Sequence, residues 1–161
     1  ELIGYMEDAA SALDYMWDKK GLQHLDIKPE NLLLSSDRIK VADFGLVTNV
    51  ADQANTLLGG LTPVYASPEV FDGTASPQSD QYSLAIVYQQ MLTGVLPFPG
   101  RNQQQLSVQH RQAAPRLSLL PEADQLVVAK ALAKDPGQRF VSCKEFVAAL
   151  QSGRVTGSQV N

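Results

Sequence analysis

Four side chains in the first third of the chain can do phosphate and metal chemistry. Asp26, Lys28 and Asn31 lie within six consecutive positions, and Asp43 follows twelve residues later. A carboxylate such as that of Asp26 can accept a proton, and a lysine ammonium can place positive charge beside a phosphate. The oxygens of Asn31 and Asp43 are of the hard type that Mg²⁺ prefers. Taken alone, Asp-x-Lys-Pro and Asp-Phe-Gly are also typical of ordinary turns, so context has to decide between the two interpretations.

A short β-hairpin is predicted between the two groups of side chains. Apolar residues 32–34 and 39–42 are separated by the polar residues 35–38, a pattern that favours two strands and a turn. We expect this hairpin to act as a rigid strap that holds Asn31 and Asp43 at one site.

Apolar residues at three- and four-residue intervals predict helices around this hairpin. The expected helices cover residues 2–20, 79–93, 103–112, 121–134 and 142 to about 151. In the 79–93 helix the predicted apolar stripe consists of Leu84, Val87, Tyr88, Met91 and Leu92. Residues 45–67 show no period of either kind, and an irregular segment of that length is usually functional. The fold class is therefore mainly α: a helical bundle with a small hairpin at the candidate site.

Composition limits the classes of function. The 161 residues favour a single domain, and the net charge of −4 is uneven: residues 1–100 hold five Lys/Arg against 13 Asp/Glu. This acidic part argues against a nucleic-acid partner, which requires a basic patch. Cys143 is the single cysteine, so an internal disulfide is impossible and a reducing, cytoplasmic compartment is expected. No apolar run reaches the roughly 20 residues that span a bilayer, so no membrane segment is expected in this chain.

Several motifs in order make the sequence similar to the protein kinase superfamily, in its Ser/Thr branch and of bacterial type. Residues 24–31, His-Leu-Asp-Ile-Lys-Pro-Glu-Asn, resemble the catalytic loop, and residues 43–45 resemble the Asp-Phe-Gly metal motif. Residues 67–69 are Ser-Pro-Glu in place of the family's Ala-Pro-Glu, and the likeness continues through residues 80–84, 92–98 and 135–140. It covers effectively all of residues 1–150.

The resemblance implies a role for each matching side chain. Asp26 is the implied base that orients a protein hydroxyl, and Lys28 the implied positive charge on the transferred phosphate. Asn31 and Asp43 are the implied Mg²⁺ ligands and, together with Lys28, the implied ATP-binding residues. Thr62 matches the threonine that bridges base and lysine and favours Ser/Thr hydroxyls over Tyr. The implied cofactors are thus ATP and Mg²⁺, and the implied partner is a protein substrate.

Four further residues match supporting positions of the family. His24 corresponds to a packed scaffold histidine rather than a catalytic one. Glu69 and Arg139 correspond to a buried ion pair, in which truncating one partner strands a charge. Asp80 corresponds to a carboxylate that braces the catalytic loop through backbone N–H groups.

The sequence departs from the family at Leu25, where the family usually has an arginine that pairs with a phosphate. Leucine cannot form that pair, so we expect any activity to be independent of such a clamp. The test is to replace Thr48 and Thr56 by Ala and measure activity. Loss of activity for lack of phosphorylation would contradict this expectation.

A second departure is that this chain has no glycine-rich loop, strand lysine or partner glutamate helix, which form the family's small lobe. We therefore expect residues 1–151 to form a large lobe that lacks its small lobe upstream, with residues 152–161 as a polar tail or linker. The isolated chain is expected to be inactive because positioning for transfer needs both lobes. The longer protein, in this interpretation, can still be tethered to a membrane.

Two other functions compete with that of a Ser/Thr kinase. A non-catalytic scaffold of the pseudokinase type is the alternative, favoured by Leu25 and the absent lobe and opposed by the intact Asp26, Asn31 and Asp43. The coding sequence upstream of Glu1 would discriminate between the two. A metal-dependent hydrolase or nuclease would leave Lys28 and the downstream motifs unexplained.

Overall fold

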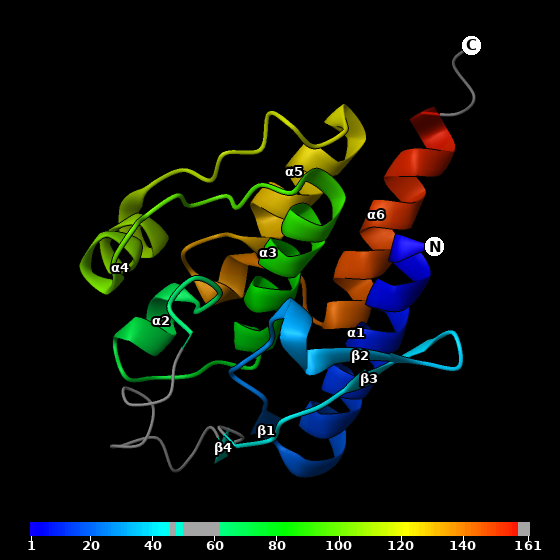
Figure 1. Ribbon diagram of the computed structural model, residues 1–161, viewed down its shortest axis with the longest axis horizontal. Coiled ribbons are helices and arrows are strands. Elements are labelled where there is room, and N and C mark those ends of the chain that lie inside the picture. The colour runs from blue at the N-terminus through cyan, green and yellow to red at the C-terminus, as the bar shows by residue number, and fades with distance from the viewer. Residues whose placement is uncertain (46–47, 50–61, 158–161) are drawn as a thin grey trace.

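The computed structural model describes residues 1–45, 48–49 and 62–157. Its helices are α1 (Leu2–Lys20), α2 (Pro68–Phe71), α3 (Ser79–Thr93), α4 (Gln103–Gln112), α5 (Glu122–Ala131) and α6 (Cys143–Gly157). Its strands are β1 (Leu22–Gln23), β2 (Leu32–Ser35), β3 (Arg38–Val41) and β4 (Thr48–Asn49). Short 3₁₀ turns cover Pro29–Asn31 and Pro136–Gln138. The predicted mainly helical fold with a small hairpin is confirmed (Figure 1).

Helix α3 is the centre of the fold. Every residue from Ser79 through Gln89 is buried, so the helix is covered on all sides rather than along one stripe. The prediction was wrong for Met91 and Leu92, which are 47% and 37% exposed. They lie in the last turn, after the continuously buried residues and before Gly94 ends the helix in the left-handed conformation.

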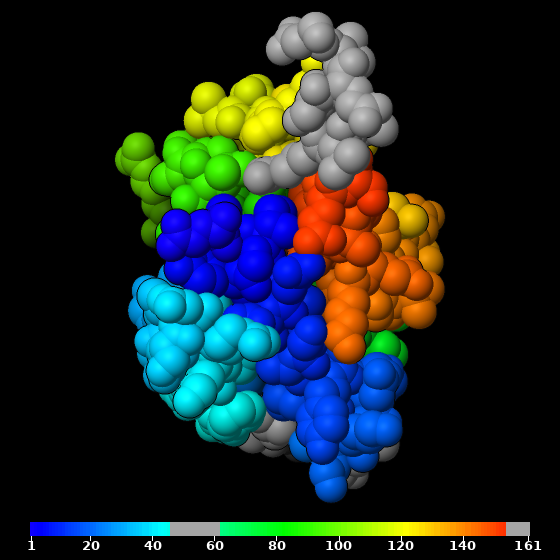
Figure 2. All heavy atoms as spheres, turned by 90° about the vertical axis from the view of Figure 1, so that its right-hand side faces the viewer, coloured from blue at the N-terminus to red at the C-terminus, as the bar shows by residue number. Residues whose placement is uncertain are grey.

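Helices α1 and α6 lie side by side, and the hairpin packs against α1, as Figure 2 shows in blue, orange and cyan. Asp14 of α1 joins the two helices, because its carboxylate accepts the backbone N–H groups of Cys143 and Lys144, both at 2.9 Å. These are free N–H groups of the first turn of α6, where a negative charge also suits the helix dipole. A side chain far away in the sequence thus caps α6.

Ser142 and Glu145 form one half of a capping box at the start of α6. Ser142 Oγ accepts the Glu145 N–H at 3.1 Å, but the Glu145 carboxylate accepts from Val141 N rather than from Ser142 N. The helix then continues to Gly157, beyond its expected end near residue 151.

Strands β2 and β3 form the predicted hairpin, with Leu32 opposite Val41. Ser36 and Asp37 have φ values of 53° and 59°, the pair of left-handed residues that a tight two-residue hairpin turn requires. The hairpin is fastened to α1 by Asp8, which accepts Ile39 N–H at 2.9 Å and pairs with Arg38.

Several elements differ from expectation or were not predicted. Helix α5 covers Glu122–Ala131 rather than the expected residues 121–134, and Pro121 is its N-cap residue. The short helix α2 and the two-residue pairing of β1 with β4 were not predicted, because neither is long enough to show a hydrophobic period. Of the threonines proposed for mutation, Thr48 lies in β4 and Thr56 lies outside the described residues. No helix within the described residues is long and apolar enough to span a membrane.

Candidate active site

Three side chains close a triangle at the candidate site. Lys28 Nζ lies 2.9 Å from Asp26 Oδ2 and donates to Thr62 Oγ1 at 3.1 Å. Thr62 Oγ1 in turn donates to Asp26 Oδ1 at 2.8 Å. Thr62 follows Asp26 by 36 residues, so the fold brings a distant segment onto the loop that contains Asp26 and Lys28.

The charges of this triangle stabilise one another. The hydrogen bond to Asp26 raises the pKa of Lys28, and the negative charges of Asp26, Glu30 and Asp43 add to the effect against the opposing desolvation. Lys28 therefore remains an ammonium at neutral pH. Asp26 is 9% exposed, so its carboxylate is largely shielded from solvent.

The hairpin brings Asn31 and Asp43 to the same place. Asn31 immediately precedes β2, Asp43 lies two residues after the end of β3, and Ala42 N–H donates to Asn31 O at 2.9 Å. Asn31 Nδ2 donates to Asp26 O at 2.8 Å and to Asp26 Oδ2 at 3.2 Å. These two donated hydrogen bonds fix the orientation of the side-chain amide. No described residue donates to its Oδ1 oxygen.

Asp43 is held differently from the buried residues beside it. Its φ is 59°, and its exposed carboxylate accepts Gly45 N–H at a long 3.3 Å. An aspartate tolerates this left-handed conformation better than most residues do. The carboxylate consequently retains free acceptor positions at the edge of the site.

Asp80 and His24 fix the course of the loop that contains Asp26. The buried carboxylate of Asp80, at the start of α3, accepts His24 N–H at 2.6 Å and Leu25 N–H at 2.8 Å. His24 is fully buried, and its Nε2 donates to Ala42 O at 2.9 Å while Nδ1 accepts the Asp26 N–H at 3.3 Å. One histidine thus ties the Asp26 loop to the strand end that leads into Asp43.

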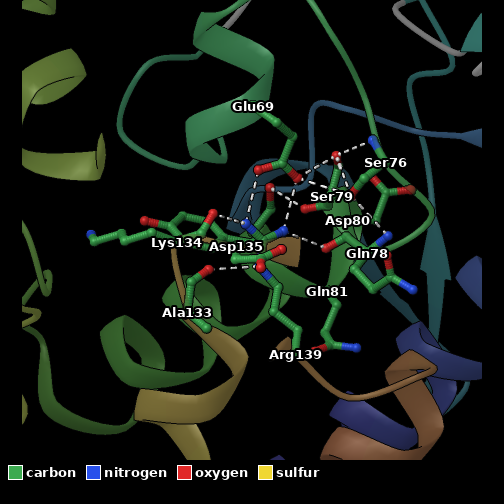
Figure 3. Close-up of polar contacts among 12 residues, drawn as sticks. Glu69, Ser76, Gln78, Ser79, Asp80, Gln81, Ala133, Lys134, Asp135 and Arg139 are labelled. Carbon is green, nitrogen blue, oxygen red and sulfur yellow. Dashed lines mark hydrogen bonds and ion pairs between the residues drawn. The ribbon is translucent and has the colours of Figure 1, made fainter. Parts of the chain in front are cut away.

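Glu69 and Arg139 form a bidentate ion pair that connects α2 to the chain between α5 and α6 (Figure 3). Both guanidinium NH groups lie 2.8 Å from the Glu69 oxygens. Ser76 and Ser79 also donate to Glu69 Oε1, at 3.0 and 2.9 Å. Burial raises the pKa of Glu69, but the hydrogen bond and charge of Arg139 outweigh it and hold the pKa below the ordinary glutamate value.

Two polar residues of this framework were missed by sequence reasoning. Gln23 Oε1 accepts the Asp80 N–H at 3.1 Å, and Ser83 Oγ donates to Tyr65 O at 2.7 Å. Through these contacts α3 is joined to the residue before His24 and to a residue three positions after Thr62. No local signal could have identified them, because Gln23 lies 57 residues from its partner and Ser83 lies 18 residues from its own.

The residues present fit a Mg²⁺ ion bound together with a phosphate compound. Mg²⁺ usually takes one or two protein oxygens and completes its shell with water and substrate phosphates. Asn31 Oδ1 and the Asp43 carboxylate offer such oxygens. The described residues contain no group of three His, Cys, Asp or Glu side chains able to hold a metal without such a ligand.

Comparison with known proteins gives matches that include all the residues of the candidate site. A family model described as the protein kinase domain matches residues 1–150. The serine/threonine-protein kinase PknL of Mycobacterium tuberculosis is 40% identical over 144 residues, which cover 83% of this chain and 36% of PknL. PknE of the same species is 34% identical over 165 residues, 98% of this chain and 28% of PknE. A probable serine/threonine-protein kinase, PknB of Lactococcus lactis, is 35% identical over 158 residues, 91% of this chain and 25% of that protein. The matched region is thus about a third or less of each relative's length.

Proposed function

Because the chain belongs to the protein kinase family, with serine/threonine kinases of bacterial type as its relatives, we propose that it forms the large lobe of a Ser/Thr protein kinase. The reaction is transfer of the γ-phosphoryl group of ATP to a Ser or Thr hydroxyl of a protein. The observation that supports this most strongly is the triangle of Asp26, Lys28 and Thr62 beside Asn31 and Asp43.

The triangle is suited to hold an acceptor hydroxyl in line with a phosphate. Asp26 accepts a hydrogen bond from the hydroxyl and takes up its proton as the oxygen attacks. Lys28, held as an ammonium, balances negative charge on the transferred group. Thr62 keeps both side chains in one orientation, so little reorganisation is needed during the reaction.

Asn31 and Asp43 are the residues that would hold Mg²⁺. When bound, the ion supplies charge neutralisation on the phosphate oxygens of ATP. Asn31 contributes an oxygen fixed by the two hydrogen bonds of its amide nitrogen to Asp26, and Asp43 contributes an exposed carboxylate.

We further propose that a small lobe must cover this site for transfer to occur. A mainly apolar hollow of about 630 Å³ lies between α1 and β3 and reaches the residue after Asp43. Its walls include Tyr15, 62% exposed, and Phe44, 56% exposed. Large exposed side chains grouped in this way usually meet another surface. A small lobe is the proposed occupant, since the relatives are much longer than the region matched here.

The test is transfer of labelled phosphate from ATP to a general acceptor protein, measured on the chain alone and on the chain joined to a small lobe. We expect transfer to Ser and Thr only in the joined protein. Asp26→Asn should then reduce kcat by about 10²–10⁴-fold, the usual contribution of a positioned base. Asp37→Asn, the same change at the exposed hairpin turn, is the matched control and should leave kcat unchanged. A joined protein that folds but transfers no phosphate would support the scaffold alternative instead.

A further inference from the structure

Leu25 has a backbone conformation that leucine ordinarily avoids. Its φ is 63°, in the left-handed region, where the Cβ atom crowds the following carbonyl oxygen. The two hydrogen bonds from His24 N and Leu25 N to Asp80 hold the backbone there. Such strain persists only where the surroundings over-determine it, and it is found mostly at functional sites.

The Leu25 side chain packs into a small apolar cluster that is distinct from the main core. It is 5% exposed. The other members of the cluster are Ala66, Val70, Ala75 and the half-buried Phe71. Most of them belong to residues 62–71, which we name the 62–71 segment. The strained backbone therefore directs an apolar side chain onto this segment.

The 62–71 segment begins at Thr62, the third member of the triangle. Toward its other end, two arginines contact it: Arg139 pairs with Glu69, and Arg111 donates to Phe71 O while pairing with Asp72. The contact from the Asp26 loop at position 25 is of another kind, since it is apolar and needs no charge on the segment.

We propose that Leu25 is an apolar latch that docks the 62–71 segment on the Asp26 loop and so positions Thr62 against Asp26 and Lys28. Leu25 is a positioning residue, not a catalytic one, because it touches none of the reacting groups. The effect of Leu25 on phosphotransfer rests on the function proposed above. The docking of the segment does not depend on that function. Docking through this contact requires no phosphate on the segment.

Hydrogen–deuterium exchange of the purified chain tests the docking. The reporters are the amides of Tyr65, Val70 and Phe71, whose hydrogen bonds lie within the 62–71 segment. Leu25→Ala should speed their exchange by about tenfold or more relative to the amides of α1 and α6, since local opening is governed by local contacts. Leu25→Met, which preserves apolar volume, should restore the wild-type rates.

Two further variants keep this experiment decisive. Leu150→Ala, a truncation of a fully buried α6 side chain, should not speed exchange of the reporter amides relative to the amides of α1 and α6. If Leu25→Ala does not fold, Val70→Ala replaces it in the experiment. This variant truncates the segment's side of the same apolar cluster and should produce the same local effect. The latch is refuted if the reporters of the folded variant exchange no faster, relative to α1 and α6, than in the wild type.

The second measurement is phosphotransfer by the chain joined to a small lobe. Leu25→Ala should lower kcat by about tenfold or more with KM for ATP unchanged, and Leu25→Met should restore kcat, as expected for a residue that positions the triangle. Faster local exchange with unchanged kcat would refute the positioning role. If the wild-type protein transfers no phosphate, the proposed function fails while the exchange result still decides the docking.

Discussion

The carboxylates of the scaffold accept several hydrogen bonds each, whereas the carboxylate at the edge of the candidate site accepts few. Asp14 and Asp80 each accept two backbone N–H groups, and Glu69 accepts both NH groups of Arg139 and two serine hydroxyls. Asp43 is exposed and accepts a single long hydrogen bond from the described residues. Saturated carboxylates are committed to holding the chain together, whereas an unsaturated one remains available to a ligand.

The comparison implies that changes in the scaffold lower stability and that changes at the site edge do not. Three substitutions test this division, in decreasing order of the expected effect on the free energy of unfolding.

Arg139→Ala should have the largest effect. The arginine side chain is fully buried, and its loss leaves the Glu69 carboxylate without its charge partner. Removing one member of a buried pair typically costs about 3–5 kcal/mol of stability. Urea denaturation monitored by circular dichroism measures the change.

The exposed pair of Arg38 and Asp8 provides the control for Arg139→Ala. Arg38 is 73% exposed, so Arg38→Ala removes a solvated interaction and should shift the urea midpoint far less. Equal losses from the two variants would contradict the distinction between a buried and a solvated ion pair.

An intermediate, pH-dependent effect is expected at His110, which is buried among Phe71, Tyr82 and Phe98. Burial, with a contribution from the charge of Lys134, lowers the pKa of His110 from 6.5 to about 3. Below pH 6.5 the unfolded chain therefore binds a proton that the folded chain does not, and stability falls as the pH drops toward 3. His110 should account for roughly 2 kcal/mol of the loss between pH 7 and pH 5.

Urea denaturation of the wild type and of His110→Gln at pH 7 and pH 5 isolates this contribution. The variant should lose less stability than the wild type over that interval, because other titrating groups are common to both. Parallel losses in the two proteins would mean that the histidine is protonated in the folded state as well.

The smallest change in stability is expected for Asp43→Asn. Asparagine also tolerates a positive φ, and the carboxylate makes no close contact with the described residues that the fold needs. The urea midpoint should be unchanged, while phosphotransfer by the chain joined to a small lobe should fall steeply, since Asp43 is a proposed Mg²⁺ ligand. A variant as unstable as Arg139→Ala would place Asp43 among the scaffold residues.

Sequence reasoning predicted the parts of the fold that depend on local patterns. The hairpin, the long helices α1 and α3 and the spacing of Asp26 and Asn31 are of this kind, because apolar periods and motif spacing are properties of adjacent residues. The covered last turn expected for α3 was wrong because exposure depends on what packs around a helix. The cap that Asp14 provides to α6 could not be predicted either, because it joins residues 129 positions apart.

The way in which Asp80 holds the Asp26 loop bears on protein engineering. Asp80 binds main-chain N–H groups of positions 24 and 25, which every amino acid except proline supplies. The two hydrogen bonds to Asp80 therefore remain available with any residue except proline at position 25. The choice of side chain there is restricted instead by burial among Ala66, Val70 and Ala75 and by the φ of 63°, so an engineered replacement has to be apolar, similar in volume to leucine and tolerant of the left-handed region.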